Sequence, residues 1–418
     1  MKKNGFTLVE ITVCVVLLVT IFLIVVPKVN TMINNKKKNA YNSLISTVKD
    51  AAQAYVYLNV NIVDDAIESQ GYYEVSIRTL QENELLENKL ENPLTGKNIP
   101  STSIVKIIKN NEEYIYKFSL DYQYLLEHII DLYSSEETRI SNGLKKDNTE
   151  DKNIRYYGSN PNNYVSFNNE LWRIIGVFGN NVKLVRKDSL GSLSWDSSES
   201  SINGGFGVNE WSQADLKNYL NTMYYGGTTV TCYGGTKNST TTCPTNILDN
   251  TAKTLIDNHT WNTGAIEYNT RTDTVAFYKD ERGNQTGKIC NGGTFCSDTV
   301  ERTTTWTGYI GLPYPTDYAY ASGENICETN MVKQDSSDAY ICENNNWMFK
   351  SIWYWTLSPF ARSANSRYVW YVNGDGDVNN SNAASGGAVF PAIYLKSNVL
   401  IESGAGTSSN PYILKAGS

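Results

Sequence analysis

Gly5-Phe6-Thr7-Leu8-Val9-Glu10 begins an apolar run that continues to Val26, and this run decides the class of protein. About 20 apolar residues in a helix, each adding ~1.5 Å, cross the hydrocarbon core of a bilayer. A secretory signal peptide would have its small-residue cleavage site after the apolar run, whereas here the glycine stands before it. The sequence therefore predicts a helix that enters a membrane near Phe6, with a plain transmembrane anchor as the alternative.

Glu10 is the charged residue within this run. A carboxylate inside a membrane helix costs a few kcal/mol, so it is normally paired or functional. If the chain is cut after Gly5, the amine of Phe6 becomes the terminus. The amine of one subunit could then neutralise Glu10 of the next when their helices pack side by side, which would set the axial stagger between subunits.

The same stretch resembles the G-F-T-L-x-E processing site of type IV prepilins and pseudopilins. In that family a membrane peptidase cuts after the glycine and methylates the new phenylalanine amine, and the glutamate guides filament assembly. The resemblance implies that Gly5 and Phe6 are the cleavage and methylation site and that Glu10 is the assembly residue. It implies that Pro27 is the helix-bending proline, since proline removes a backbone donor. The implied partners are a prepilin peptidase, other pilin subunits and the cytoplasmic membrane.

The predicted fold class is α+β. Apolar residues such as Leu44, Val48 and Ala52 recur at helical spacing after Pro27, so we expect one long helix, first in the membrane and then against a globular domain. Ile104–Ile108 and Tyr114–Phe118 alternate and predict a β-hairpin. The predicted segments are a leader at 1–5, a transmembrane/pilin helix at 6–59, a small pilin-type α+β domain at 60–140, a polar linker at 141–152 and a larger β-rich extracellular module at 153–418.

The large module carries a resemblance of its own, over about residues 153–415. Its opening, Phe167 to Val177, and its ending, Trp355-Thr356-Leu357-Ser358-Pro359 followed by Val389 to Val399, resemble an extracellular module of exported proteins of Gram-positive anaerobes. The closing pattern is also similar to C-type-lectin-like and formylglycine-enzyme-like folds, which serve mostly for binding. Such modules often have arginine before the second proline, where this chain has Phe390.

Cysteines are confined to the apolar run, at Cys14, and to the region after residue 230. An even number in the exported part predicts disulfides formed in an oxidising space, although many connectivities are open. Local pairing gives Cys232–Cys243, Cys290–Cys296 and Cys327–Cys342. A zinc site is disfavoured, because the chain has no C-x-x-C and only His128 and His259.

No catalytic residue, cofactor or metal site is predicted. His259 is the only histidine of the large module, and neither a G-x-S-x-G elbow nor a P-loop is present. Oxygen-bearing residues alternate from Asn373 to Asn379, as in a calcium loop, but Val378 and Ala384 occupy the positions where an EF-hand needs glycine and a carboxylate. We therefore expect a hairpin turn there.

The composition of the chain favours some classes of ligand and disfavours others. The net charge of −7 argues against nucleic-acid binding by the large domain. The 29 Tyr and 9 Trp suit a surface that binds glycan or protein, since rigid aromatic rings cover much area at little entropy cost. Some tryptophans are expected to contact such a ligand, although we expect most of them in the core; they are Trp195, Trp211, Trp261, Trp306, Trp347 and Trp353.

The predicted function is a minor pilin or pseudopilin, anchored in the cytoplasmic membrane and assembled into a cell-surface pilus or pseudopilus, that displays an adhesion domain. One alternative is a pseudopilin of a DNA-uptake or type II secretion-like machine. A second is an enzyme on a pilin anchor, for which a pocket holding His259 against a carboxylate and a serine would be the sign. A third is a plain membrane-anchored surface protein.

Overall fold

The computed structural model describes residues 36–37, 39–93, 97–99, 101, 103–110, 113–119, 123–197, 202–235, 237–267, 273–283, 303–332, 341–361 and 366–416. The chain forms two compact units, one up to Tyr122 and one from Gln123 to Gly417. Both helices and sheets are present, which confirms the α+β class. None of the helices in the described ranges is long and apolar enough to cross a membrane, and Phe6–Val26 lies outside those ranges.

The first unit is a helix laid on an antiparallel sheet. Residues 39–58 are helical, and Val48, Ala52 and Val56 are buried at four-residue intervals, which is the spacing that the sequence predicted. This helix is interrupted at Asn59, which precedes the next helix. Gly71, with a φ of 83°, ends that second helix. The remaining elements are α2 (Val60–Gln70), β1 (Tyr73–Ser76), α3 (Ile77–Glu82), β2 (Glu91–Asn92), β3 (Lys97–Asn98), β4 (Ile104–Asn110) and β5 (Glu113–Ser119).

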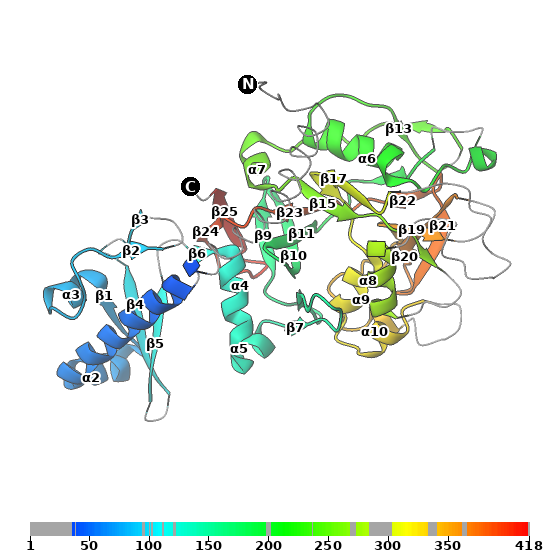
Figure 1. Ribbon diagram of the computed structural model, residues 1–418. Helices are drawn as coiled ribbons and strands as arrows, with labels where there is room; N and C mark the ends of the chain where they lie inside the picture. Colours follow the sequence, from blue (N-terminus) through cyan, green and yellow to red (C-terminus); the bar gives the residue numbers. More distant parts are fainter. Residues whose placement is uncertain are drawn as a thin grey trace, which may run out of the picture. The chain divides into compact units, whose positions relative to one another are not determined.

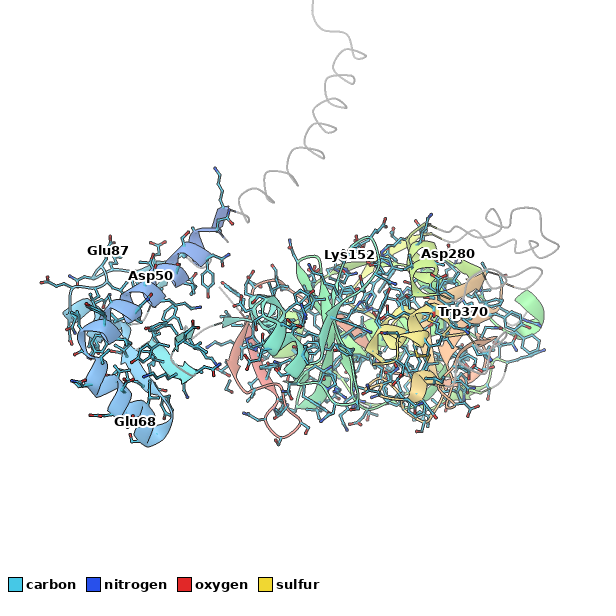
Figure 2. All side chains as sticks on the ribbon, turned by 90° about the horizontal axis from the view of Figure 1, so that it is seen from below. Asp50, Glu68, Glu87, Lys152, Asp280 and Trp370 are labelled. Atoms are coloured by element: carbon cyan, nitrogen blue, oxygen red, sulfur yellow. A yellow bond between two sulfur atoms is a disulfide. The ribbon has the colours of Figure 1, made fainter. Side chains whose placement is uncertain are left out.

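The sheet of this unit runs in the order β1-β4-β5, and Figure 1 shows the blue helices lying across it. β4 and β5 pair antiparallel with Ile107 opposite Tyr116, so the predicted hairpin is confirmed. Val105 and Ile107 alternate toward the helix and join Val48 and Ala52 in one buried cluster. Glu68, by contrast, is exposed near the end of α2, where Figure 2 labels it.

The second unit is built around a large mixed sheet. Its strands follow the order β18-β23-β11-β10-β9-β25-β24-β6, with β8 beside β10 and β7 beside β8. They are β6 (Gln123–Tyr124), β7 (Leu144–Lys146), β8 (Ile154–Tyr156), β9 (Tyr164–Phe167), β10 (Glu170–Phe178), β11 (Asn181–Arg186), β18 (Ile310–Gly311), β23 (Ala392–Leu395), β24 (Val399–Ser403) and β25 (Tyr412–Ala416). Asn168 and Asn169, at φ of 56° and 55°, make the tight turn between β9 and β10.

A smaller sheet has the order β12-β22-β19-β20-β21, with β16 beside β19. Its strands are β12 (Ser192–Ser194), β16 (Ile266–Glu267), β19 (Tyr354–Ala361), β20 (Tyr368–Val372), β21 (Val378–Asn382) and β22 (Gly386–Ala388). Two further pairs of antiparallel strands are present. β13 (Cys232–Tyr233) and β14 (Thr240–Thr241) form a hairpin, and β15 (His259–Asn262) pairs with β17 (Thr305–Gly308), which follows much later in the chain.

Helices cover the sheets of the second unit, and Figure 1 shows α8, α9 and α10 grouped together, with α9 contacting β8 and β20. They are α4 (Leu125–Ser134), α5 (Glu136–Ser141), η1 (Ile202–Gly205), η2 (Trp211–Gln213), α6 (Asp215–Asn218), the π-helical η3 (Tyr219–Tyr225), α7 (Asn250–Leu255), α8 (Thr274–Gly283), α9 (Pro315–Ala321) and α10 (Ile326–Thr329). The core between these layers is aromatic: its fully buried tryptophans are Trp172, Trp195, Trp211, Trp261, Trp355 and Trp370, the last labelled in Figure 2.

The predicted linker at 141–152 is wrong, and so is the boundary at residue 140. The second unit begins at Gln123, because β6 pairs with β24 and the apolar face of α4 joins the core of that unit. The polar residues from 141 to 152 include strand β7, and Asp147 and Thr149 are buried. Thr149 Oγ1 and Arg155 Nε both donate to the carboxylate of Asp147, so polarity there marks a buried polar network.

Candidate binding cleft

A cleft of about 350 Å³ opens on the second unit where three separate segments meet. Its lining residues are Phe206, Gly235, Lys237, Asn382, Ala384 and Ser385. They come from the residues after η1, from the loop between β13 and β14, and from the turn between β21 and β22. We call this the 206–385 cleft.

The β21–β22 turn is fixed on both sides. Ser385 N donates to Asn382 O at 2.9 Å, which closes the turn, and Ala384 N donates to Phe206 O at 3.0 Å. From the other side, Ser194 Oγ donates to Ala384 O at 2.9 Å. The turn therefore presents its Asn382 and Ser385 side chains from a rigid backbone.

A disulfide positions the loop that carries Lys237. Cys232 and Cys243 are bonded, and β13 pairs with β14 just inside them. Gly386 on β22 lies so close to this loop that a Cβ there would be 2.9 Å from Gly235 N. The close approach of the two backbones, which glycine permits, holds the loop against the turn.

Two cations lie against the aromatic ring of the cleft. Lys237 Nζ is 4.0 Å from the centroid of the Phe206 ring, and Arg367 Cζ is 4.4 Å from it. Such contacts place positive charge on an apolar surface. None of the ion pairs formed between described residues includes Lys237 or Arg367, so this charge is not neutralised within the described part of the chain.

Two buried polar atoms at this place lack hydrogen-bond partners among the described residues: Asn382 Oδ1 and Arg367 Nε. A buried polar group without a partner costs free energy, and native proteins contain few of them. One of the two is an acceptor and the other a donor. Together with the Ser385 hydroxyl and the Lys237 ammonium, the cleft can therefore both accept and donate hydrogen bonds to a bound molecule.

Apart from the cleft, the second unit holds a cluster of charged side chains with almost no exposure. Arg155 Nε donates to Asp147 Oδ2 at 2.9 Å and its Nη1 donates to Asp317 Oδ1 at 2.6 Å. Lys183 Nζ donates to the other oxygen of Asp317 at 2.5 Å. These groups come from β8, β11, α9 and the loop before β8, so the cluster connects the large sheet to the helices.

Burial governs the titration of this cluster. It raises the pKa of Glu281 to about 8 and lowers the pKa of Lys183 to about 8. For Asp317, burial opposes ionisation, but the charges of Lys183 and Arg155 outweigh it and lower the pKa. Ser358 Oγ donates to Glu281 Oε1 at 3.1 Å, while Glu281 Oε2 has no hydrogen-bond partner among the described residues. Burial thus favours the protonated form of Glu281, while Asp147 and Asp317 pair with Arg155 and Lys183.

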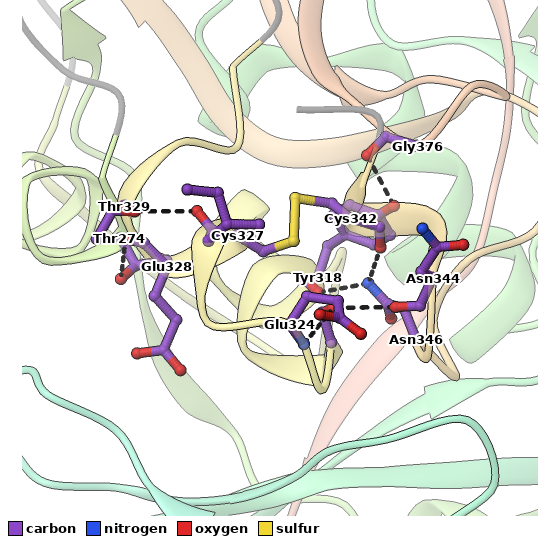
Figure 3. The surroundings of a disulfide bond; sticks show 12 residues. Thr274, Tyr318, Glu324, Cys327, Glu328, Thr329, Cys342, Asn344, Asn346 and Gly376 are labelled. Carbon is purple, nitrogen blue, oxygen red and sulfur yellow. Dashed lines mark hydrogen bonds between the residues drawn. A yellow bond between two sulfur atoms is a disulfide. The ribbon is translucent and has the colours of Figure 1, made fainter. Parts of the chain in front are cut away.

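The described residues contain two of the three predicted disulfides. Cys232–Cys243 and Cys327–Cys342 are both present, while Cys290 and Cys296 lie outside the described residues. Figure 3 shows Cys327–Cys342 joining α10 to the segment around Asn346, whose Nδ2 donates to Tyr318 O at 3.1 Å. The described ranges do not include the predicted processing, assembly and helix-bending residues or the first cysteine, which are Gly5, Phe6, Glu10, Pro27 and Cys14.

The two histidines occupy different settings. His128 Nε2 and Tyr412 Oη are 2.8 Å apart, and burial lowers the pKa of His128 to about 4. The ring of His259 stacks on Tyr394 at 3.7 Å, and its Nδ1 is 3.2 Å from Asp257 Oδ2. A carboxylate is therefore present beside His259, but its hydrogen bonds within the described residues include no serine hydroxyl.

Two further expectations concern the turn and the tryptophans. Residues 373–377 form the predicted hairpin turn, with Val372 opposite Val378 and Gly376 at a φ of 91°. Of the tryptophans named as candidates for ligand contact, Trp306 and Trp353 are partly exposed; the buried ones are Trp195, Trp211, Trp261 and Trp347. Most of them are thus core residues, as expected.

Sequence reasoning missed the cleft and the charged cluster. No motif links Phe206, Lys237 and Asn382, which are brought together only by the fold. The cluster did leave a signal, because Lys183 interrupts the apolar run Val182 to Val185 on a central strand. A charge in such a run indicates a buried ion that needs a partner.

Comparison of the chain with protein-family models, with curated proteins and with solved structures found no match in any of the three. The resemblance to type IV prepilins therefore rests on the N-terminal motif and on the residues that follow it.

Proposed function

We propose that this chain is a type IV pilin-like subunit that holds a binding domain at the cell surface. The carrying observation is the prepilin-type motif Gly5 to Glu10, followed in the chain by a helix that packs on an antiparallel sheet. The helix over 39–58 buries Val48, Ala52 and Val56 against that sheet, the arrangement that the resemblance implies. A long helix from Phe6, bent at Pro27, is part of this proposal.

Features of the second unit support display outside the cytoplasm. Its disulfides, Cys232–Cys243 and Cys327–Cys342, persist in oxidising spaces and are rare in the cytosol. The 206–385 cleft offers hydrogen-bonding groups and positive charge on an otherwise acidic chain of net charge −7. A large unit of this kind suits a filament tip or a sparse position, where bulk does not disturb subunit packing.

The first test is the mass of the N-terminal peptide, with and without a co-expressed prepilin peptidase. We expect a chain that begins at Phe6 with a methylated amine only when the peptidase is present. Gly5→Val should leave the leader uncut. An intact Met1 with active peptidase and wild-type Gly5 would overturn the proposal.

Assembly is tested separately from cleavage. Glu10→Gln should still be cleaved and methylated, because the cut lies at Gly5, but it should be lost from sheared filaments since the partner of the Phe6 amine is neutral. Thr12→Ser, a matched change on the same segment, serves as the control. Equal incorporation of the Glu10→Gln chain would contradict the assembly role.

A further inference from the structure

The 206–385 cleft has a specific chemical profile. It combines an apolar floor, made by the Phe206 ring and Ala384, with the Ser385 hydroxyl and the unpartnered Asn382 Oδ1. Lys237 stands at the rim as an exposed ammonium 4.0 Å from the Phe206 ring centroid. Arg367 lies on the same ring and has a buried Nε without a partner among the described residues.

Each group restricts the ligand. Asn382 Oδ1 accepts hydrogen bonds and therefore needs a donor such as a hydroxyl. Lys237 and Arg367 only donate and carry charge, so they favour a carboxylate or phosphate. Phe206 and Ala384 give the cleft an apolar part that suits the C–H groups of a sugar. At about 350 Å³ the cleft is at the lower end of small-molecule sites, so it holds one or two rings and not a folded partner.

We infer that the 206–385 cleft binds an anionic saccharide, a sugar unit bearing a carboxylate or a phosphate, with Lys237 facing the anion and Asn382 accepting from a ring hydroxyl. Arg367, which does not line the cleft, adds positive charge from the Phe206 ring behind it. This inference deepens the proposed binding role and rests on it for its biological setting. The recognition itself depends only on the second unit. The Cys232–Cys243 disulfide then has a role in binding, because it holds the Lys237 loop against the β21–β22 turn.

The test is calorimetric titration of the full chain in detergent micelles with matched probes. Galacturonate is compared with galactose, and glucose 6-phosphate with glucose. We expect the charged member of at least one pair to bind at least tenfold more tightly than its neutral counterpart. The pair that responds identifies carboxylate or phosphate as the anion. Equal binding within both pairs, or no binding by either charged probe, would overturn the inference.

Variants locate the site. Lys237→Ala should weaken binding of the charged probe by about tenfold or more, the loss expected for a charge-assisted hydrogen bond. Asn382→Asp should weaken it further, since it places a carboxylate next to the anion. Lys152→Ala removes an exposed lysine that does not line the cleft, and it should change nothing. If all three variants bind like the wild type, the ligand sits elsewhere and the inference fails.

A failure of this ligand inference can be distinguished from a failure of the proposed pilin function. Calorimetry on purified chain requires neither cleavage after Gly5 nor assembly through Glu10. A processed chain that binds no charged probe keeps its pilin role and loses this ligand class. An unprocessed chain that binds galacturonate through Lys237 keeps the ligand and loses the pilin role.

Discussion

The two units of this protein each contain a lysine–aspartate pair, and the two pairs differ chiefly in burial. Lys109 Nζ and Asp64 Oδ1 are 3.1 Å apart, with about a third of each side chain exposed (29% and 31%). Lys183 Nζ and Asp317 Oδ2 are 2.5 Å apart, and both side chains are 0% exposed. The comparison teaches that burial, more than the pairing itself, decides how strongly a unit depends on such a contact.

The surroundings of the two pairs differ in the same way. The first unit has an aliphatic core of residues such as Val48, Ala52, Val105 and Ile107, and its ion pair lies at the surface. The second unit places Lys183 among aromatic rings, with Tyr314 at 4.1 Å and Trp261 at 5.4 Å. If one partner of such a buried pair is removed, water cannot solvate the remaining charge. The stability of the second unit therefore depends on these pairs.

The largest effect is expected from Asp317→Ala. The change leaves Lys183 and Arg155 buried without their shared counter-charge, which typically costs about 3–5 kcal/mol. Every tryptophan lies after residue 171, so tryptophan fluorescence during urea unfolding reports the second unit alone. We expect the urea midpoint of the second unit to fall sharply. The hydrogen exchange of β4, which reports the first unit, should be unchanged. An unchanged fluorescence midpoint would show that the cluster is dispensable.

A smaller loss is expected when both Cys327 and Cys342 are replaced by serine. Their disulfide closes a separation of 15 residues, and a loop of that size restricts the unfolded chain by about 3 kcal/mol. The loss should again appear in the fluorescence of the second unit. Wild-type protein treated with a reductant, which also opens Cys232–Cys243, should lose at least as much, and no shift in either experiment would contradict a stabilising role.

The pH dependence of the second unit should follow Glu281. Its pKa is raised from 4.5 to about 8, so the stability it contributes is fully present below pH 4.5 and is lost as pH rises through 8. His128 and His259 have lowered pKa values. The stability that they contribute therefore increases with pH only up to about pH 6.5, the pKa of an unperturbed histidine. Glu281 alone should lower the free energy of unfolding by about 1 kcal/mol per pH unit between pH 6.5 and 8. Lys183 and Lys350, whose pKa values are lowered to about 8, act in the opposite direction from about pH 8 upward, so the Glu281 contribution is read as the difference from a variant that does not titrate at this position.

Glu281→Gln is the matched control for that dependence. The amide keeps the shape of the protonated acid and its bond from Ser358, but it does not titrate. In fluorescence-monitored unfolding, the wild-type chain should therefore lose stability relative to the variant as the pH rises from 6.5 to 8. A difference between the two chains that stays constant across this range would assign the titration to another group.

The smallest effect is expected from Asp64→Ala in the first unit. Asp64 accepts from Tyr114 Oη at 2.7 Å and from Lys109, which together lower its pKa, but all three side chains reach solvent. Water replaces the lost contact, so the unfolding of the first unit, followed by hydrogen exchange of β4, should be nearly unchanged. A loss as large as that of Asp317→Ala would break the contrast between the two pairs.

The sequence by itself determined the local elements of both units. The hairpin at 104–118, the turn after Asn373 and the helix stripe from Val48 follow from residue periods and turn chemistry, which act over a few residues. The disulfides Cys232–Cys243 and Cys327–Cys342 were predictable for the same reason, since their partners are close in the chain. The prepilin-type motif is also readable in this way, and its function stays a prediction.

Only the tertiary structure decided where polar residues are buried. Residues 141–152 read as a linker because composition cannot distinguish side chains bound to water from side chains bound to each other. The partners in the charged cluster lie 134 and 162 residues from Asp317, and the cleft joins Lys237 of the β13–β14 loop to Asn382 at the end of β21. Such contacts depend on how distant strands pair, and that pairing is set by the packing of the whole unit and leaves no period in the sequence.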